Sequence, residues 1–194
     1  REVVYSYYPI VYLSLGGFNF STLADAYLQL NLREATTFYQ RFPYIKPEFI
    51  HEFRYGLSLP KATKLLKREE YGLGNEDLVL ITVGNRLAAE LDEEYLKSIC
   101  GLLKEKVGLK WLIVGLAELK YLKDNYQDLL GKKIILLSYE DDLMALYNIC
   151  DVYLNPRRHG GGISVAMAME QGLPVVVFSD SSDGLTYVGE ANGV

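Results

Sequence analysis

From residue 78 onward the sequence alternates short apolar runs with longer amphipathic stretches, and this alternation restricts the fold more than any other feature. The runs are continuously apolar, which is typical of strands that are buried on both faces. Strands separated by helices predict an α/β fold built on a parallel sheet. The expected strands cover residues 78–83, 110–114, 133–137, 151–154 and 175–178.

The stretches between these runs predict helices, most of which end at a glycine. Because crossovers between parallel strands are right-handed, helices in these positions predict a doubly wound, Rossmann-like sheet. We expect the helices over residues 92–107, up to residue 130, over residues 141–150 and over residues 163–171.

The chain before residue 57 has a different character, being aromatic and irregular. It contains a β-like run at residues 10–15 and a helical pattern over residues 21–32. Residues 57–67 read as a connector that leads into a helix ending near Gly72. We therefore divide the chain into residues 1–56 and a domain over residues 57–194. The first residue is not methionine and no closing helix follows the last strand, so we expect both ends to be cut from a longer protein.

Composition excludes several classes of protein. An apolar fraction of 49% with 23% charged residues is ordinary for a globular chain. A net charge of −5 gives no support to a general nucleic-acid-binding surface. Two cysteines far apart in the sequence indicate buried thiols of a reducing compartment, and two histidines without a CxxC motif argue against a zinc site.

Ligands of open parallel sheets bind outside the carboxyl ends of the strands, and two loops at those ends have suitable residues. The first loop, Gly84-Asn85-Arg86, follows the first expected strand of the domain. The second, residues 155–162, contains Arg157, Arg158 and three successive glycines before a helix.

The second loop has the features of a diphosphate cradle. Glycines let a ligand approach the backbone, and a helix start with Ser164 near its N-cap offers unpaired N–H groups to an anion. The two arginines add cationic donors. The loop is neither a P-loop nor a GxGxxG fingerprint. The alternative is a flexible surface loop whose glycines merely turn the chain.

Six short motifs follow one another between residues 57 and 190. In this order and spacing they resemble the C-terminal, nucleotide-sugar-binding domain of GT-B fold glycosyltransferases, of the kind called glycosyl transferases group 1. The resemblance implies that residues 1–56 are the trailing part of the N-terminal domain. The motifs are Gly84-Asn85-Arg86-Leu87, Val114-Gly115, the acidic and apolar run 141–147, Asp151-Val152-Tyr153-Leu154-Asn155-Pro156, Gly160-Gly161-Gly162-Ile163-Ser164 and Gly172-Leu173-Pro174-Val175-Val176.

The resemblance also implies roles for residues at matching positions. The donor diphosphate would be bound by Arg86, Arg157, Arg158, His159, Gly160, Gly161, Gly162, Ile163 and Ser164. The nucleotide would be bound by Gly84, Asn85, Gly115, Ser138, Tyr139 and Glu170. A catalytic base is expected on the missing N-terminal domain. For Arg86 the alternative is a solvated arginine at a helix start, and for Glu170 an ordinary exposed helix residue.

The chain departs from the pattern of retaining relatives, which have two glutamates separated by seven residues. His159 and Met167 stand at those positions, and Glu170 lies one helical turn further on. The lysine expected after Gly-Arg-Leu is absent, with Glu90 and Leu91 nearby. The remaining motifs are closer to bacterial enzymes that glycosylate surface proteins or polysaccharides.

The resemblance implies an enzyme that binds a nucleoside-diphosphate sugar, UDP-linked, and transfers the sugar to a polysaccharide, protein or lipid. Loop amides and arginines would stabilise the departing diphosphate without a metal or other cofactor. We expect a cytoplasmic protein, or a peripheral one at the inner face of the membrane, alone or in a homo- or hetero-oligomer, and inactive as this fragment. The alternatives are a catalytically silent subunit of a glycosylation or secretion complex, or another Rossmann-like protein such as an epimerase.

Overall fold

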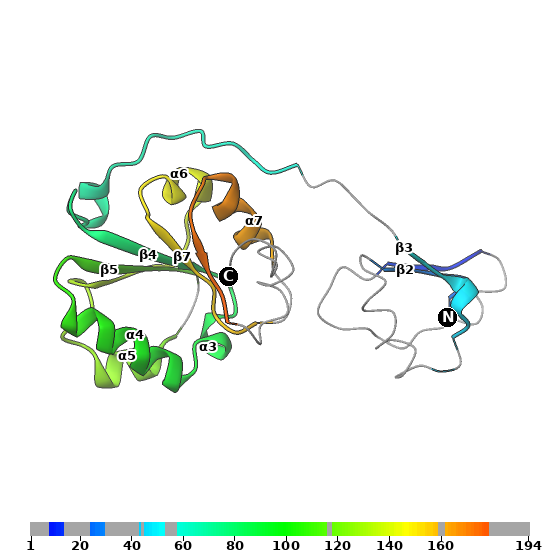
Figure 1. Cartoon of the computed structure of the whole chain (residues 1–194), viewed down its shortest axis with the longest axis horizontal. Helices are drawn as coiled ribbons and strands as arrows, with labels where there is room; N and C mark the ends of the chain where they lie inside the picture. Colours follow the sequence, from blue (N-terminus) through cyan, green and yellow to red (C-terminus); the bar gives the residue numbers. More distant parts are fainter. Residues whose placement is uncertain are drawn as a thin grey trace. The chain divides into compact units, whose positions relative to one another are not determined.

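The computed structural model describes residues 8–13, 24–29, 43, 45–52, 58–115, 118–158 and 162–178. The chain divides into two compact units, Arg1–Ser58 and Leu59–Val194 (Figure 1). The assignment of residues 1–56 to the end of a preceding domain stays a prediction.

The described part of the first unit is a small parallel sheet in the order β1-β2-β3. Tyr27 is buried at its centre beside Ile45 and Ile50, and Tyr12 packs against this cluster. A 3-10 helix, η1, precedes the last strand. The bounds are β1 Val11–Leu13, β2 Ala26–Gln29, η1 Pro47–Phe49 and β3 Ile50–Glu52.

One prediction for this unit is confirmed and one is wrong. The β-like run at residues 10–15 forms β1 where the structure describes it. The helix expected over residues 21–32 is contradicted at residues 26–29, which form the central strand β2. This strand pairs with β1 on one side and β3 on the other, so two ladders of backbone hydrogen bonds outweigh the local helical pattern.

The second unit contains a five-stranded parallel sheet in the order β6-β5-β4-β7-β8. Each predicted strand is present, and β8 is shorter than expected. The predicted α/β, doubly wound sheet is therefore confirmed. The strands are β4 Leu78–Val83, β5 Leu109–Val114, β6 Ile134–Leu137, β7 Val152–Leu154 and β8 Val175–Val176.

The helices of this unit differ from the predictions in three ways: α3 was not predicted, the helix expected to end near Gly72 is a short 3-10 helix, and the others are shorter than expected. The 3-10 helix η2 ends at Gly72, whose φ of 68° is readily adopted by glycine. The helix α4 starts at Asp92, whose side chain accepts a hydrogen bond from the Tyr95 amide at 2.8 Å. The helices are η2 Arg68–Tyr71, α3 Leu87–Glu90, α4 Glu93–Glu105, α5 Lys120–Asn125, α6 Leu143–Tyr147 and α7 Ile163–Glu170.

The helix expected to continue to residue 130 ends early, because α5 stops at Asn125. The carbonyl of Leu129 accepts hydrogen bonds from the amides of Lys133 and Ile134, so the chain turns directly into β6. Gly131 adopts a φ of 72° within that turn. The turn uses the backbone groups that a longer helix would need.

Two layers of helices cover the sheet, with α3, α4 and α5 on one side and α6 and α7 on the other (Figure 1). Alternate side chains of each strand enter opposite cores, as a buried strand requires. Ile81 and Leu112 belong to the core shared with α6 and α7, whereas Trp111 and Ile113 belong to the core shared with α4 and α5. This two-sided burial explains why the strands read as continuous apolar runs.

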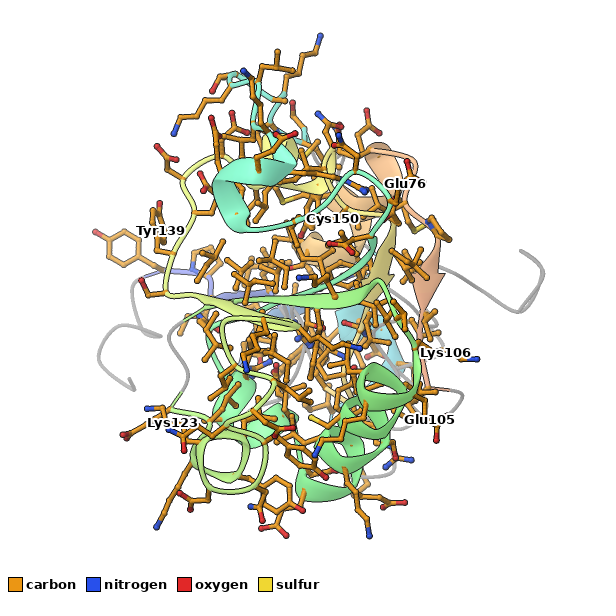
Figure 2. All side chains as sticks on the ribbon, turned by 90° about the vertical axis from the view of Figure 1, so that its left-hand side faces the viewer. Glu76, Glu105, Lys106, Lys123, Tyr139 and Cys150 are labelled. Carbon is orange, nitrogen blue, oxygen red and sulfur yellow. The ribbon has the colours of Figure 1, made fainter. Side chains whose placement is uncertain are left out.

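Both cysteines lie inside this unit as buried, free thiols, which confirms their predicted burial. Figure 2 shows Cys150 in the interior of the unit. Burial raises the pKa of Cys100 to about 11 and that of Cys150 to about 12, so both thiols stay protonated near neutral pH. Across the described ranges, no helix combines the length and apolarity that a membrane crossing would need.

The strand order also fixes where loops from different parts of the chain converge. The chain builds β5 and β6 on one side of β4 and then β7 and β8 on the other side. The order therefore reverses between β4 and β7, and the loops that follow these two strands flank the switch point.

Candidate functional site

A cavity of about 370 Å³ lies at this switch point, at the carboxyl ends of the strands. Residues from β4, β5, the segment after β6, the loop after β7 and the start of α7 contribute to it. A parallel sheet brings these distant segments to one edge because all its strands point the same way. The lining residues are Val83, Gly84, Asn85, Arg86, Glu90, Val114, Gly115, Ser138, Tyr139, Glu140, Leu143, Arg158, Ile163 and Ser164.

Two glycines make the floor of the cavity possible. Gly115 has a φ of 140°, and a Cβ atom there would lie 1.7 Å from the carbonyl oxygen of Gly84. At Gly84 a Cβ atom would lie 3.1 Å from Nη2 of Arg158. The absence of both side chains lets the ends of β4 and β5 meet and lets an arginine lie against them.

Arg158 is a buried cation in the wall of the cavity, with its side chain only 4% exposed. Its Nη1 donates to the carbonyl oxygen of Val83 at 3.0 Å. Its Nη2 lies 3.1 Å from Oε2 of Glu90 in an ion pair without hydrogen-bond alignment. Among the described residues, Nε has no hydrogen-bond acceptor. This arginine therefore keeps donor capacity for a ligand.

Arg86 contributes a second cation from the start of α3. Its side chain is 51% exposed, and its Nη2 lies 3.1 Å from Oε1 of Glu90. Glu90 is thus held between two arginines, one exposed and one buried. The two positive charges of this wall face one internal negative charge.

The start of α7 supplies backbone donors on another side of the cavity. Gly162 is the N-cap residue, and no side chain caps the helix. Ser164 is the second residue of the helix, two residues before Ala166, whose N–H donates to the Gly162 carbonyl. Amides at such a helix start attract anions.

The segment after β6 contributes Ser138, Tyr139 and Glu140 to the lining of the cavity. The Glu140 carboxylate accepts hydrogen bonds from the Tyr71 hydroxyl at 3.0 Å and from the Asp142 amide at 3.1 Å. Burial, followed by the hydrogen bond to Glu140, raises the pKa of Tyr71 to about 12. The Tyr139 side chain extends away from the protein body (Figure 2) and is 77% exposed.

A second hollow of about 510 Å³ adjoins the first, and Gly115 and Ser138 line both. Leu119, Leu136 and Leu137 supply apolar surface to it, and Glu118 lies at its rim. A ligand with a charged part and a flat, less polar part would therefore find two connected sites at the same edge of the sheet.

The cavity brings together most of the predicted residues that the structure describes. Gly84, Asn85, Arg86, Gly115, Ser138, Tyr139, Arg158, Ile163 and Ser164 line it. Gly162 lies beside it as the N-cap of α7. His159, Gly160 and Gly161 lie outside the described residues.

Two predicted residues lie elsewhere. Cζ of Arg157 lies over the ring of Phe178, 4.4 Å from its centroid, and the residue lines a separate hollow against α4. Glu170 is exposed at the end of α7 and does not line the main cavity. Met167, at the position of a glutamate in related enzymes, is buried in the core against α6 and the sheet.

Besides Glu140, which directly follows the predicted Ser138 and Tyr139, four lining residues were not among the predicted site residues. Val83 and Val114 directly precede the predicted Gly84 and Gly115, and Leu143 starts α6, so their places at strand and helix ends were available signals. Glu90 follows Arg86 by four residues, the spacing of neighbours on a helix, but the short helix α3 was not predicted. Its contact with Arg158 depends on the meeting of two loops that are remote in sequence.

Several solved structures share the fold of this chain. Anabaena Alr3699/HepE in complex with UDP matches with a TM-score of 0.69 and 20% identity, over 94% of this chain and 56% of that chain. WaaG, a glycosyltransferase involved in lipopolysaccharide biosynthesis, matches with a TM-score of 0.65 and 19% identity, over 86% and 47%. A mutant of S. aureus TarM matches with a TM-score of 0.62 and 16% identity, over 84% and 31%.

These likenesses confirm that the second unit has the Rossmann-like fold of a GT-B half. The chain spans about half the length of the first two structures and less of the third. A comparison with curated protein sequences finds no significant match. The model of the protein family named glycosyl transferases group 1 matches residues 63–192. This range is most of the second unit and more than half of the chain. The chain belongs to the glycosyl transferases group 1 family.

Proposed function

We propose that this chain is the donor-binding part of a glycosyltransferase. It binds a nucleoside-diphosphate sugar, UDP-linked, whose sugar is transferred to a polysaccharide, protein or lipid acceptor. The diphosphate occupies the cavity of about 370 Å³, and the base lies towards the hollow that shares Gly115 and Ser138.

The observation that carries this proposal is the convergence of Arg86, Arg158 and the start of α7 on one cavity. Arginine guanidinium groups and helix-start amides are strong donors to phosphate oxygens. Negative charge develops on the diphosphate as the sugar departs, and fixed donors stabilise that charge. The wall can therefore assist transfer without a metal ion.

The solved structures support the choice of donor. Alr3699/HepE has been crystallised with UDP, with UDP and glucose, and with UDP-glucose. The TarM structure contains UDP together with α-GlcNAc-glycerol. WaaG acts in lipopolysaccharide biosynthesis, which supports a surface glycan as the acceptor class.

The acceptor site and any catalytic base belong to the rest of the protein in this proposal. The chain by itself binds donor and does not turn it over. The whole protein works in the cytoplasm or at the inner face of the membrane, with the acceptor and the remaining GT-B domain as partners, alone or in an oligomer.

Calorimetric titration with UDP tests the donor site. The Arg86→Ala variant should weaken UDP binding at least about tenfold, because a charge-assisted hydrogen bond is worth about 1.5–3 kcal/mol. The Lys97→Ala variant is the matched control, since Lys97 is an exposed cation of α4 outside the cavity. It should bind UDP as the unaltered chain does. Absence of heat at millimolar UDP, or equal losses in both variants, would contradict the proposal.

A catalytically silent donor-binding subunit is the second candidate, and the position of Met167 favours it. This side chain is buried in the core and has no carboxylate to offer a ribose. A UDP-sugar assay of the whole protein with candidate acceptors separates the two functions. Sugar transfer that Arg86→Ala weakens supports the enzyme, whereas UDP binding without transfer or donor hydrolysis supports the silent subunit.

A further inference from the structure

The cavity wall contains an anion of its own. The Glu90 side chain is 9% exposed, and each carboxylate oxygen faces a different arginine. Oε1 lies 3.1 Å from Nη2 of Arg86, and Oε2 lies 3.1 Å from Nη2 of Arg158. A site whose cations are offered to a phosphate thus already has a carboxylate between them.

The two arginines are held to very different degrees. Arg158 is 4% exposed, donates to the Val83 carbonyl oxygen at 3.0 Å and lies against the bare backbone of Gly84. A charge buried this far needs a counter-charge close by. Arg86 is 51% exposed and stands at the edge of the cavity, where its long side chain can change rotamer.

Glu140 is the other carboxylate among the described residues that line the cavity, and its interaction partners are not arginines. It accepts from the Tyr71 hydroxyl and the Asp142 amide and lies 4.0 Å from Nζ of Lys64. These partners belong to the connector, to η2 and to the segment after β6, and neither arginine is among them. Glu90 is therefore the carboxylate positioned to compete with a bound phosphate among the described lining residues.

We propose that Glu90 is an internal counter-ion that sets the affinity of this site for phosphate groups. Without a ligand its single negative charge is shared between the two arginines. When a diphosphate binds, Arg86 exchanges its ion pair with Glu90 for one with the phosphates. Glu90 then remains beside Arg158 as its buried counter-charge. This inference rests on the proposed function, because it assigns a role within the donor site.

The proposal predicts opposite effects on stability and on binding. Without the carboxylate, Arg158 is a buried charge that lacks its counter-ion, so the empty protein is less stable. The same change removes a negative charge next to the phosphates and leaves Arg86 unengaged by Glu90, so a diphosphate binds more tightly. A purely structural Glu90 would give lower stability and weaker binding together.

The test compares the unaltered chain with Glu90→Gln and Glu105→Gln. Glu105 is an exposed glutamate at the end of α4, on the opposite side of the unit from Tyr139 (Figure 2), so the control changes the same charge far from the cavity. Calorimetry at fixed ionic strength measures the binding of uridine, UMP and UDP. Melting curves with and without UDP follow stability.

Glu90→Gln should bind UDP about tenfold more tightly, as expected when one like charge a few ångströms from the phosphates is removed. The gain should be smaller for UMP and absent for uridine. The variant should melt at a lower temperature when empty and gain more from UDP than the unaltered chain does. Glu105→Gln should match the unaltered chain in every measurement.

The outcomes separate this inference from the proposed function. If the unaltered chain binds UDP and Glu90→Gln binds it equally or less tightly, the inference is wrong and the proposed function stands. A gain for uridine equal to the gain for UDP also overturns it. If both chains are folded and neither binds UDP, the proposed function fails and takes the inference with it. Should Glu90→Gln unfold when empty, refolding on addition of UDP supports the inference, and failure to refold contradicts it.

Discussion

Gly115 is the position in the site where the backbone most strongly restricts the choice of residue. Its φ of 140° and its approach to the Gly84 carbonyl exclude any larger side chain. A Gly115→Ala substitution would strain the backbone and drive the ends of β4 and β5 apart. We expect it to lower the free energy of unfolding by about 3 kcal/mol, from steric overlap and backbone strain together. Urea denaturation measures this loss.

Gly101→Ala is the matched control for that experiment. Gly101 lies inside α4 and has no atoms within 4 Å of the position a Cβ would take. Because alanine favours helices over glycine, this change should stabilise the protein by up to about 1 kcal/mol. A Gly115→Ala protein as stable as the unaltered chain would show that the two strand ends can separate freely.

At the scale of single residues, the sequence predicted where the site lies better than it predicted which charged side chains are buried in it. Residues next to strand ends, such as Gly84, Arg86 and Ser138, follow directly from the order of strands and loops. The burial of Arg158 does not, because it depends on how closely the loop after β7 packs on β4. The sequence also does not show that Arg157 lies outside the cavity. Two adjacent side chains leave the backbone in different directions, and Arg157 lies against Phe178.

The connector before η2 is tied to α6 by one carboxylate. Oδ2 of Asp142 accepts hydrogen bonds from the Thr63 amide at 2.7 Å, the Thr63 hydroxyl at 2.7 Å and the Lys64 amide at 2.9 Å. Oδ1 accepts from the Ala145 amide at 2.9 Å and so caps α6. These hydrogen bonds, with the one to Ala145 first, lower the pKa of Asp142 to about 2.

Asp142→Asn should lower the urea midpoint at neutral pH, because its amide nitrogen cannot accept the bonds that one carboxylate oxygen now accepts. The native pKa lies below the ordinary value of 3.8, so the carboxylate stabilises the fold above about pH 4. That contribution is lost as the pH falls towards 2. The difference between the variant and the unaltered chain should therefore shrink over this range, as urea titrations at several pH values will measure.

Asp124→Asn provides the comparison, since Asp124 is an exposed residue of α5. It should leave the midpoint nearly unchanged throughout. A difference between Asp142→Asn and the unaltered chain that stays constant down to pH 2 would contradict the role assigned to the carboxylate.

At the scale of elements, the sequence predicted strands more reliably than helices. The five strands of the second unit were found because burial on both faces leaves a continuous apolar run in each. Helical periodicity alone predicted too much. It extended α5 past Asn125, where the backbone of Leu129 is used to turn into β6, and it assigned β2 to a helix. In both places the deciding hydrogen bonds join segments that local pattern does not connect.

The chain consists of two units, and among the residues that the structure describes their buried clusters have no member in common. The described buried residues of the first unit form a small cluster around Tyr27, whereas the two large clusters lie between Leu59 and Phe178 in the second unit. Separate cores are the usual condition for independent folding. We therefore expect the polypeptide 59–194 to unfold cooperatively and to bind UDP within about twofold of the full chain.

A shorter polypeptide, 73–194, is the informative comparison because it lacks η2 and the connector. Arg68 donates to the carbonyl oxygens of Ile149 and Asp77 and to both carboxylate oxygens of Asp151, which joins the starts of β4 and β7. Loss of this partly exposed guanidinium should cost about 2 kcal/mol, and loss of the Asp142 contacts should add to that. Denaturation of both polypeptides measures the difference. Equal stability of the two polypeptides would mean that the connector and η2 do not stabilise the domain. A failure of 59–194 to fold would mean that the second unit depends on the first for its stability.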